Sequence, residues 1–418
     1  MRIILVVQPW RLDYYSHLSE AKDVEWILLW YEKPVHVKGN LAEIPFPFKE
    51  VIYWGDYLTP ARLIKKVKPD RILFYEIIDL RQIALIVTAS AYQVPTYYSD
   101  HGAAGDKEAT IKYIQTKTFK NHTLPYLINR LKNHFFDSLR SKLFFFSVFK
   151  GFRSRASYIK YFLLPFKMLR RSSHEVLLHS KFTERIPVIP IVFNEPNYED
   201  FESYTGASKE KIFFPGVPFF DQYYRDSYST ADYLVYIEHP YYEDQLANWT
   251  FEHHQFVARK LFAFAEKNKV KIYIKLHPRS DLKIWEGYTY NKEYIEIIQS
   301  GDDLTFLYLQ AKLILGFSSS LLNGFLSVKK NVVLIGWNPE PHIEGTDFSS
   351  TGLCHASLDI NELDTKYQYW LNHNLAVENE LNYQAFLKKY NYPFDGKARQ
   401  RIIQVLLDPA SIRLDQSF

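Results

Sequence analysis

The chain has 418 residues, of which 47% are hydrophobic and 23% are charged. This composition is typical of a folded, soluble protein and excludes an intrinsically disordered one. The length exceeds the roughly 250–300 residues that one hydrophobic core usually serves, so it predicts two domains. The single cysteine, Cys354, excludes an internal disulfide framework and a zinc site of several cysteines, and it favours the cytoplasm.

The N-terminus is a short apolar run over residues 2–7 that meets the polar Gln8 and Pro9 at once. We interpret this run as a first β-strand and not as a signal peptide. No apolar run elsewhere in the sequence approaches the roughly 18 residues expected of a membrane span.

Strand and helix patterns alternate along residues 1–110. Short apolar runs rich in β-branched and aromatic residues predict strands, and longer periodic runs between them predict helices. The expected strands cover residues 2–7, 26–30, 51–54, 70–75 and 94–98, with helices near 60–67 and 80–92. Repetition at this spacing predicts an open parallel sheet with helices on both faces.

The last of these strands leads into Asp100-His101-Gly102. The carboxyl ends of parallel strands line the ligand crevice of such a sheet, and Gly102 permits a tight turn there. An acid beside an imidazole at this place predicts a general base, either Asp100 or His101. The alternatives are that Asp100 only caps a turn or helix, and that His101 is a structural histidine. A metal site is disfavoured because a lone ligand does not make one.

Residues 118–171 interrupt this pattern with a basic and aromatic segment. Twelve Lys and Arg but one acid lie between Lys120 and Arg171, a local charge of +11 in a chain of net charge +4. Basic segments rich in Phe and Leu are typical of interfacial membrane helices, and each basic residue near anionic lipid contributes about 1 kcal/mol. We therefore predict attachment to a membrane surface. The alternatives are an ordinary helical insertion and a nucleic-acid patch, for which no reader motif is present.

Segments at residues 175–178, 186–193, 211–214 and 217–218 are expected to close the first half as strands and connections. A second alternating series begins near residue 231. Its expected strands cover 233–237, 270–275, 313–315 and 331–336, with helices near 245–268, 302–311 and 318–326 and a last amphipathic helix at 396–407.

The sequence therefore predicts an α/β fold of two Rossmann-like domains that face each other across a cleft. The first domain is expected at residues 1–225, with the basic aromatic helical insertion at about 118–171. The second domain is expected at 226–395, followed by a C-terminal helix and tail at 396–418.

One expected strand of the second domain ends in cationic side chains. Lys275, His277 and Arg279 follow the run at 270–275. His277 precedes Pro278, which restricts it to extended geometry and can aim its imidazole rigidly into a cleft. A protonated histidine there would stabilise a leaving phosphate.

Another expected strand ends at Leu315 and is followed, after Gly316 and Phe317, by Ser318, Ser319 and Ser320. These serines stand directly before a helical run. A helix N-terminus supplies unpaired N–H groups and a partial positive charge, so hydroxyls added there suit a phosphate. The alternative is helix capping, although three serines exceed the need for one cap.

These motifs resemble those of bacterial sialyltransferases. Lys275-Leu276-His277-Pro278 and Gly316-Phe317-Ser318-Ser319 are similar to their Lys-x-His-Pro and Ser-Ser motifs, and Asp100-His101-Gly102 stands where they carry an acid-acid-Gly motif. The motifs cover a small part of the chain. The resemblance implies a metal-independent, inverting glycosyltransferase of the two-domain GT-B type that uses CMP-activated nonulosonic acids. Its first domain would bind the acceptor and its second the nucleotide sugar.

The resemblance also implies roles for the matching residues. Asp100 is expected to deprotonate the acceptor hydroxyl, and His277 to bind the CMP phosphate and help it leave. Lys275 is expected at the cytosine side, Ser318 and Ser319 at phosphate oxygens, and Asp302 or Asp303 at the ribose, with Asp302 preferred. The full set expected to bind the nucleotide is Lys275, His277, Pro278, Arg279, Asp302, Gly316, Ser318, Ser319 and Ser320.

The sequence departs from this family at His101, where a second carboxylate is usual. His101-Gly102 together with His277-Pro278-Arg279 also resembles CDP-glycerol and CDP-ribitol phosphotransferases of teichoic acid synthesis. CMP-Kdo transferases of capsule synthesis have a similar His-Pro. The cytidine phosphate leaving group is therefore predicted more firmly than the group transferred.

The expected function is transfer of sialic acid or a related nonulosonic acid from CMP to a lipooligosaccharide, capsule or lipid-linked glycan. The enzyme would sit peripherally at the inner face of the membrane through residues 118–171, with no nucleic-acid partner. We expect no cofactor besides the donor and no metal, since no Asp-x-Asp motif is present. The rivals are a nucleotide-sugar epimerase and a non-enzymatic scaffold of capsule assembly.

Overall fold

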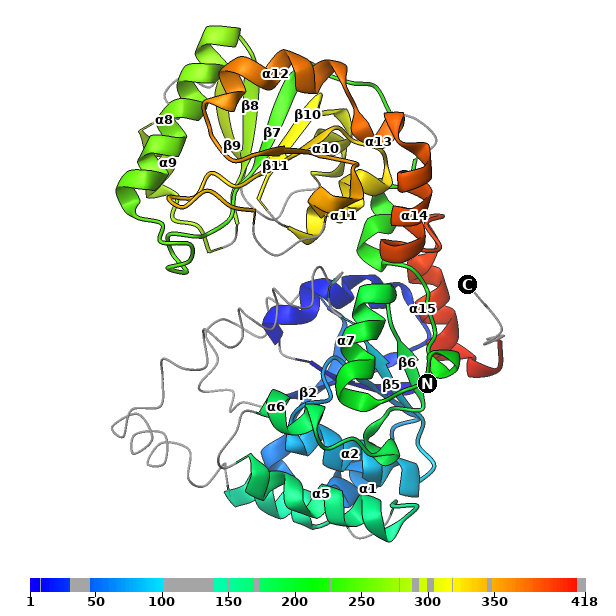
Figure 1. Cartoon of the computed structure of the whole chain (residues 1–418). Helices are drawn as coiled ribbons and strands as arrows, with labels where there is room; N and C mark the ends of the chain where they lie inside the picture. The colour runs from blue at the N-terminus through cyan, green and yellow to red at the C-terminus, as the bar shows by residue number, and fades with distance from the viewer. Residues whose placement is uncertain are drawn as a thin grey trace. The chain divides into compact units, whose positions relative to one another are not determined.

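The structure is a computed structural model of the whole chain (Figure 1). It describes residues 1–7, 9–30, 46–100, 102, 139–148, 151–168, 173–225, 228–277, 279–287, 293–298, 304–317, 319–343 and 348–411. The chain divides into two compact units. The first holds the described residues up to 102, from 139 to 219 and from 397 to 411, and the second holds those from 220 to 396. The domain boundaries and the cleft expected from the sequence stay predictions.

The first unit is built on a six-stranded parallel sheet in the order β3-β2-β1-β4-β5-β6. Its strands are β1 (Arg2–Val6), β2 (Glu25–Trp30), β3 (Phe48–Tyr53), β4 (Arg71–Phe74), β5 (Thr96–Ser99) and β6 (Ile189–Ile191). The inner strands are nearly continuous apolar runs, as expected of parallel strands buried on both faces. Counted from β1, this order is the 3-2-1-4-5-6 of a Rossmann fold, which reverses between β1 and β4.

The helices of the first unit carry clear start and stop signals. In α1 (Pro60–Val67) the Thr59 side chain accepts from Arg62 N, and in α2 (Leu80–Ala91) Asp79 and Gln82 form a capping box. The other labelled helices are α5 (Arg155–Lys167), α6 (Ser173–Leu178), α7 (Glu195–Thr205) and α15 (Ala398–Leu407). Residues 139–146 are also helical. Helix α6 takes the place of the strand or connection expected at 175–178.

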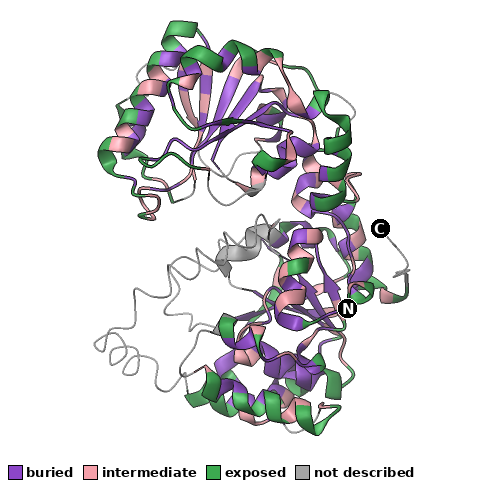
Figure 2. Cartoon of the chain, in the orientation of Figure 1, coloured by how far each residue is buried: buried purple, intermediate pink, exposed green. Residues whose placement is uncertain are grey.

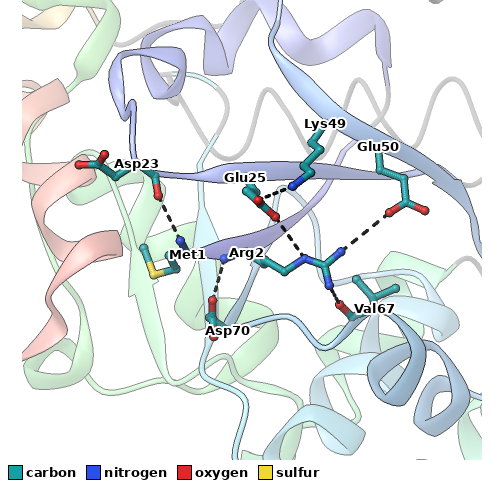
Figure 3. A network of polar contacts seen from close by, with 8 residues as sticks. All are labelled: Met1, Arg2, Asp23, Glu25, Lys49, Glu50, Val67 and Asp70. Atoms are coloured by element: carbon teal, nitrogen blue, oxygen red, sulfur yellow. Dashed lines mark hydrogen bonds and ion pairs between the residues drawn. The ribbon is translucent and has the colours of Figure 1, made fainter.

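The amino ends of β1, β2 and β3 are held together by a polar network (Figure 3). Arg2 N donates to Asp70 Oδ2 at 2.7 Å, and the Arg2 guanidinium lies 3.5 Å from Glu25 and 3.9 Å from Glu50. Lys49 also pairs with Glu25. Exposed ion pairs of this kind contribute little each, about 0–1 kcal/mol. They occupy the edge of the sheet opposite to its carboxyl ends, where polar side chains can stay hydrated.

The second unit repeats the topology, with the order β12-β11-β10-β7-β8-β9. Its strands are β7 (Tyr233–Ile237), β8 (Lys271–Lys275), β9 (Ile295–Ile298), β10 (Leu313–Gly316), β11 (Val332–Ile335) and β12 (His355–Ser357). All neighbouring pairs are parallel. This is again the order 3-2-1-4-5-6, and it reverses between β7 and β10.

Helices lie on both sides of this sheet in Figure 1. They are α8 (Phe251–Asn268), α9 (Lys283–Glu286), α10 (Thr305–Gln310), α11 (Ser320–Ser327), α12 (Glu362–Asn372), α13 (Leu375–Glu378) and α14 (Glu380–Tyr390). Phe264 of α8 and Tyr367 of α12 join one core with Tyr236 and Ile274 of the sheet. Figure 2 shows the inner strands of both sheets mostly buried and the outer faces of the helices exposed, whereas the edge strand β3 is partly exposed.

Helix α8 begins later than the sequence predicted. The expected start at residue 245 is wrong because Gln245, Ala247 and Asn248 have left-handed backbone, with φ between 50° and 56°. The helix instead begins at Phe251, after Thr250, whose side chain accepts a hydrogen bond from His253 N. The predicted fold class is confirmed, since each unit is a Rossmann-like α/β fold.

Candidate functional site

Three adjacent strands of the second unit end side by side in polar residues. Strand β7 lies between β10 and β8, and Ile237 of β7 is in register with Gly316 of β10 and Lys275 of β8. The residues that follow these three positions therefore leave the sheet at one edge. This edge includes the point between β7 and β10 where the strand order reverses, which is where open α/β sheets bind ligands.

His277 stands just beyond β8 in a tight turn. Ser280 N donates to His277 O at 2.9 Å, and Arg279 N donates to the imidazole Nδ1 at 3.2 Å. Because Nδ1 accepts, the neutral ring carries its proton on Nε2. Burial, followed by the nearby charges of Arg279 and Lys275, lowers the pKa of His277 to about 4. At neutral pH it is thus an uncharged N–H donor, and a bound anion would raise its pKa and favour uptake of a proton from solvent.

The two cations of this motif have different surroundings. Lys275 is half-buried, its Nζ donates to Leu276 O at 2.6 Å, and burial lowers its pKa. Arg279 makes a two-pronged ion pair with Asp244, with both N···O distances at 2.7 Å. The Arg279 side chain is still 54% exposed, so it remains accessible to a ligand.

Glu238 is a residue of this edge to which the sequence motifs assigned no functional role. It follows β7, is 4% exposed, and its Oε2 accepts from His277 N at 3.3 Å and from Ser280 Oγ. Its Oε1 lies 3.5 Å from Nε2 of the buried His254. Burial raises the pKa of Glu238 to about 7. The sequence signal was Glu238-His239-Pro240 directly after an apolar strand, the same kind of ending as Leu276-His277-Pro278.

The β10 end leads into α11 through a close contact. A Cβ on Gly316 would lie 3.1 Å from Leu322 Cδ2, so a larger residue would press on the helix. Ser319 caps α11, and its Oγ accepts from Leu321 N at 3.3 Å. The Ser319 hydroxyl accepts this one bond and keeps its O–H as a donor, and Ser320 is the first residue of the helix. Four predicted site residues lie outside the described residues, namely His101, Pro278, Asp302 and Ser318.

In the first unit Asp100 follows β5 and is 4% exposed. Tyr98 donates its hydroxyl to Oδ1 at 2.6 Å, and Phe193 N donates to Oδ2 at 3.0 Å. Burial raises the pKa of Asp100 to about 7, Asp200 adds to the rise, and the bonds from Tyr98, Phe193 and Asn197 oppose it. A carboxyl with this pKa is close to half-ionised at neutral pH, as general acid–base chemistry prefers.

The backbone around Asp100 is held from three directions. Asp100 N donates to Ile191 O at 3.2 Å, which continues the pairing with β6. Tyr15 donates its hydroxyl to Ser99 O at 2.9 Å. Tyr98 also stacks on Phe201 of α7, with ring centroids 4.7 Å apart. The carboxyl is therefore fixed in place, and a carboxylate still has lone pairs beyond those in use.

Within the described ranges, no group of three or more His, Cys, Asp and Glu side chains is placed to hold a metal ion. Among the same residues, no helix is both long and apolar enough to cross a membrane.

No protein-family model matches this chain, and a comparison with curated proteins finds no match. Solved structures do match in fold. A protein from Listeria monocytogenes described as a UDP-N-acetylglucosamine 2-epimerase aligns with 100% of this chain and 99% of its own, at a TM-score of 0.53 and 11% identity. The glycosyltransferase of kitacinnamycin aligns with 97% of this chain and 98% of its own, at a TM-score of 0.50 and 10% identity.

The wall teichoic acid polymerase TagF, studied as its H444N variant with CDPG, aligns with 99% of this chain and 90% of its own. The TM-score is 0.50 and the identity 11%. Identities this low concern the fold and carry no donor specificity. The chain has the GT-B-like fold of two Rossmann-like units.

Proposed function

We propose that this chain is a transferase that uses a cytidine-nucleotide donor and passes a CMP-bound sialic acid or related nonulosonic acid to a cell-surface glycan. The observation that carries the proposal is the edge of the second sheet where Lys275 and His277, at the end of β8, and Ser319, after β10, stand on either side of β7. Cationic side chains, a neutral imidazole donor and a helix N-terminus at the reversal of the strand order suit a nucleotide phosphate.

On this proposal the acceptor hydroxyl attacks the anomeric carbon as the bond between that carbon and the CMP phosphate oxygen breaks. Asp100 takes the hydroxyl proton, which its raised pKa favours. The electron pair of the broken bond stays on CMP, where the Nε2–H of His277 and the charge of Lys275 stabilise it. Ser318, Ser319 and Ser320 stay predicted phosphate contacts, and Asp302 a predicted ribose contact.

Arg279 favours a second candidate, a CDP-glycerol or CDP-ribitol phosphotransferase. It follows His277-Pro278 and keeps an exposed guanidinium suited to a second phosphate. A CMP-Kdo transferase would use the same His277. These donors differ in the group transferred and not in the cytidine, so the same nucleotide site would suit all three candidate functions.

We also propose that helix α5 docks on an anionic membrane surface. One face of α5 packs inward through Tyr161, Leu164 and Pro165. The opposite face exposes four large apolar side chains at helical spacing, Ile159, Phe162, Leu163 and Phe166. The described residues 139–148 and 151–168 add six cations and no acid, and these cations are Arg140, Lys142, Arg153, Arg155, Lys160 and Lys167. An exposed apolar stripe flanked by cations suits an anionic lipid surface.

Thermal unfolding with CMP, CDP, UDP, GDP and ADP, with and without magnesium, tests the donor class. A ligand at 100 times its dissociation constant stabilises by about 2.7 kcal/mol, which is easily seen. Stabilisation by CMP that is indifferent to magnesium supports the proposal and leads to CMP-sugars as donors. A preference for CDP favours the phosphotransferase. Stabilisation by UDP alone, the ligand class expected of an epimerase, would overturn both cytidine readings.

A further inference from the structure

His239 occupies the position on β7 that His277 occupies on β8. Ile237 and Lys275 are paired in register, and each histidine stands two residues further along its strand and directly before a proline. The two rings have centroids 6.1 Å apart and are inclined by only 30°. The edge of the sheet thus carries two neighbouring imidazoles, of which the sequence motifs had singled out one.

The order of the strands places His239 between the two halves of the proposed phosphate site. His277 follows β8 and Ser319 follows β10, and β7 lies between these strands. Neighbouring strands are about 4.8 Å apart, so the ends of β8 and β10 are separated by roughly 10 Å. A phosphate group that contacts the ends of both β8 and β10 must therefore lie next to the end of β7, close to His239.

The charges around His239 favour an anion. Its pKa is lowered to about 4, first by burial and then by His277 and Arg279, while Asp244 opposes the shift. Asp244 is itself paired with Arg279, and Glu238, the neighbouring carboxyl, has a pKa raised to about 7 by burial. The edge therefore holds several basic groups with little free negative charge at slightly acid pH.

His239 also has unused hydrogen-bonding capacity. Its Nδ1 is buried, and no described residue hydrogen-bonds to it. The ring instead packs against Tyr241, with centroids 4.5 Å apart. A buried polar atom without a partner costs free energy, which a bound ligand or water can recover.

We infer that His239 is a second phosphate-binding imidazole of this site, acting beside His277 on the phosphate of the nucleotide. The inference rests on the proposed function for the nucleotide, while the phosphate contact itself does not depend on the base. Inorganic pyrophosphate is therefore a useful second probe besides CMP and CDP.

Two substitutions separate a binding role from a packing role. His239→Phe keeps a ring against Tyr241 but has no polar atom, whereas His239→Gln keeps a hydrogen-bonding group and loses the ring. If His239 binds phosphate, His239→Phe weakens CMP and pyrophosphate binding about tenfold or more, and His239→Gln weakens it less. If His239 only packs against Tyr241, the order of the two variants is reversed: His239→Phe keeps the affinity and His239→Gln weakens it. His373→Gln, at the end of α12, is the matched control and leaves binding unchanged.

Isothermal titration calorimetry of the full chain at pH 7, in two buffers of different ionisation enthalpy, gives affinity and proton uptake together. We expect uptake of protons on CMP binding and a smaller uptake in both His239 variants. CMP binding by the wild type with affinity and uptake unchanged in both variants would overturn the inference but leave the proposed function. Pyrophosphate binding that depends on His239, without binding of any cytidine nucleotide, would support the inference and overturn the proposed function.

Discussion

The backbone N–H of His277 donates to Oε2 of Glu238 at 3.3 Å, and Ser280 Oγ donates to the same oxygen. Glu238 therefore holds both ends of the turn that carries His277 and Arg279. A carboxyl buried at the end of one strand fixes the loop that follows the next strand. The position of the imidazole is thus set by a residue outside the His-Pro motif.

Removal of this carboxyl should loosen the turn. We expect Glu238→Ala to lower the free energy of unfolding by about 1–3 kcal/mol, since two donors lose a buried acceptor. Glu238→Gln keeps an acceptor oxygen and should lose less. Urea unfolding of both variants and of the wild type at pH 5 measures the difference. Equal losses in Ala and Gln would contradict the role of the oxygen.

The same carboxyl should make stability depend on pH. The pKa of Glu238 is raised from 4.5 to about 7, so the folded state binds its proton more readily than the unfolded state. The contribution of this raised pKa to the free energy of unfolding is fully present below pH 4.5 and is lost as the pH rises through 7. Glu238→Gln removes this loss, so its stability relative to the wild type should rise between pH 4.5 and 7 by on the order of 3 kcal/mol. Unfolding curves at pH 5 and pH 8 compare the two proteins, and an unchanged difference would show that the carboxyl does not titrate there.

The Arg279–Asp244 pair makes a prediction about ligand affinity. Both Asp244 oxygens hold the guanidinium at 2.7 Å, so Asp244 competes with any phosphate for it. Asp244→Asn should tighten CMP and pyrophosphate binding several-fold, because it removes a negative charge near Arg279, His277 and His239. Calorimetric titration measures the affinity. Weaker binding would show that Arg279 needs Asp244 to be positioned and would assign Asp244 to the support of the site.

The strands and strand-end residues could be predicted from the sequence, whereas their contacts could not. Runs such as Tyr233–Ile237 and Lys271–Lys275 are apolar because parallel strands are buried on both faces, so the pattern is local. The contacts of Glu238 and the role proposed for His239 depend on β7 lying between β8 and β10, an arrangement that a local sequence pattern does not reveal. The start of α8 was predicted wrongly because Gln and Ala rarely adopt left-handed backbone, so the residue types of Gln245 and Ala247 do not indicate it.

The exposed face of α5 makes a prediction for membrane binding. Each large apolar side chain buried in lipid contributes about 1.5–3 kcal/mol, so the double variant Phe162→Ser, Phe166→Ser should reduce binding to vesicles strongly. Leu381→Ser, at an apolar residue of the second unit that is 88% exposed, is the control. Sedimentation with vesicles that contain the anionic lipid phosphatidylglycerol measures the bound fraction. Equal binding by both variants and the wild type would exclude α5 as the docking surface.

The positive charge of α5 should contribute to vesicle binding independently of its apolar side chains. Lys160 and Lys167 of α5 are exposed, and their Nζ atoms donate to Lys181 O at 3.0 Å and to Ser180 Oγ at 3.1 Å. Lys160→Gln with Lys167→Gln should weaken binding to anionic vesicles by about 2 kcal/mol at low salt and leave the weak binding to neutral vesicles unchanged. High salt should remove the difference between the variant and the wild type, because it screens exposed charges. A loss that persists on neutral vesicles would point to a structural defect.

The hydrogen bond from Tyr98 to Asp100 leads to a prediction for the pH dependence of transfer. If Asp100 is the base, Asp100→Asn should lower kcat by about 10²–10⁴-fold while CMP still binds, which separates the base from the nucleotide site. In the wild type, kcat/KM should rise with pH and level off above about 7, where Asp100 is ionised. Tyr98→Phe removes a hydrogen bond that lowers the pKa of Asp100, so the midpoint of the profile should move to higher pH. A profile that keeps its midpoint in Tyr98→Phe would mean that another group, such as His101, is the base.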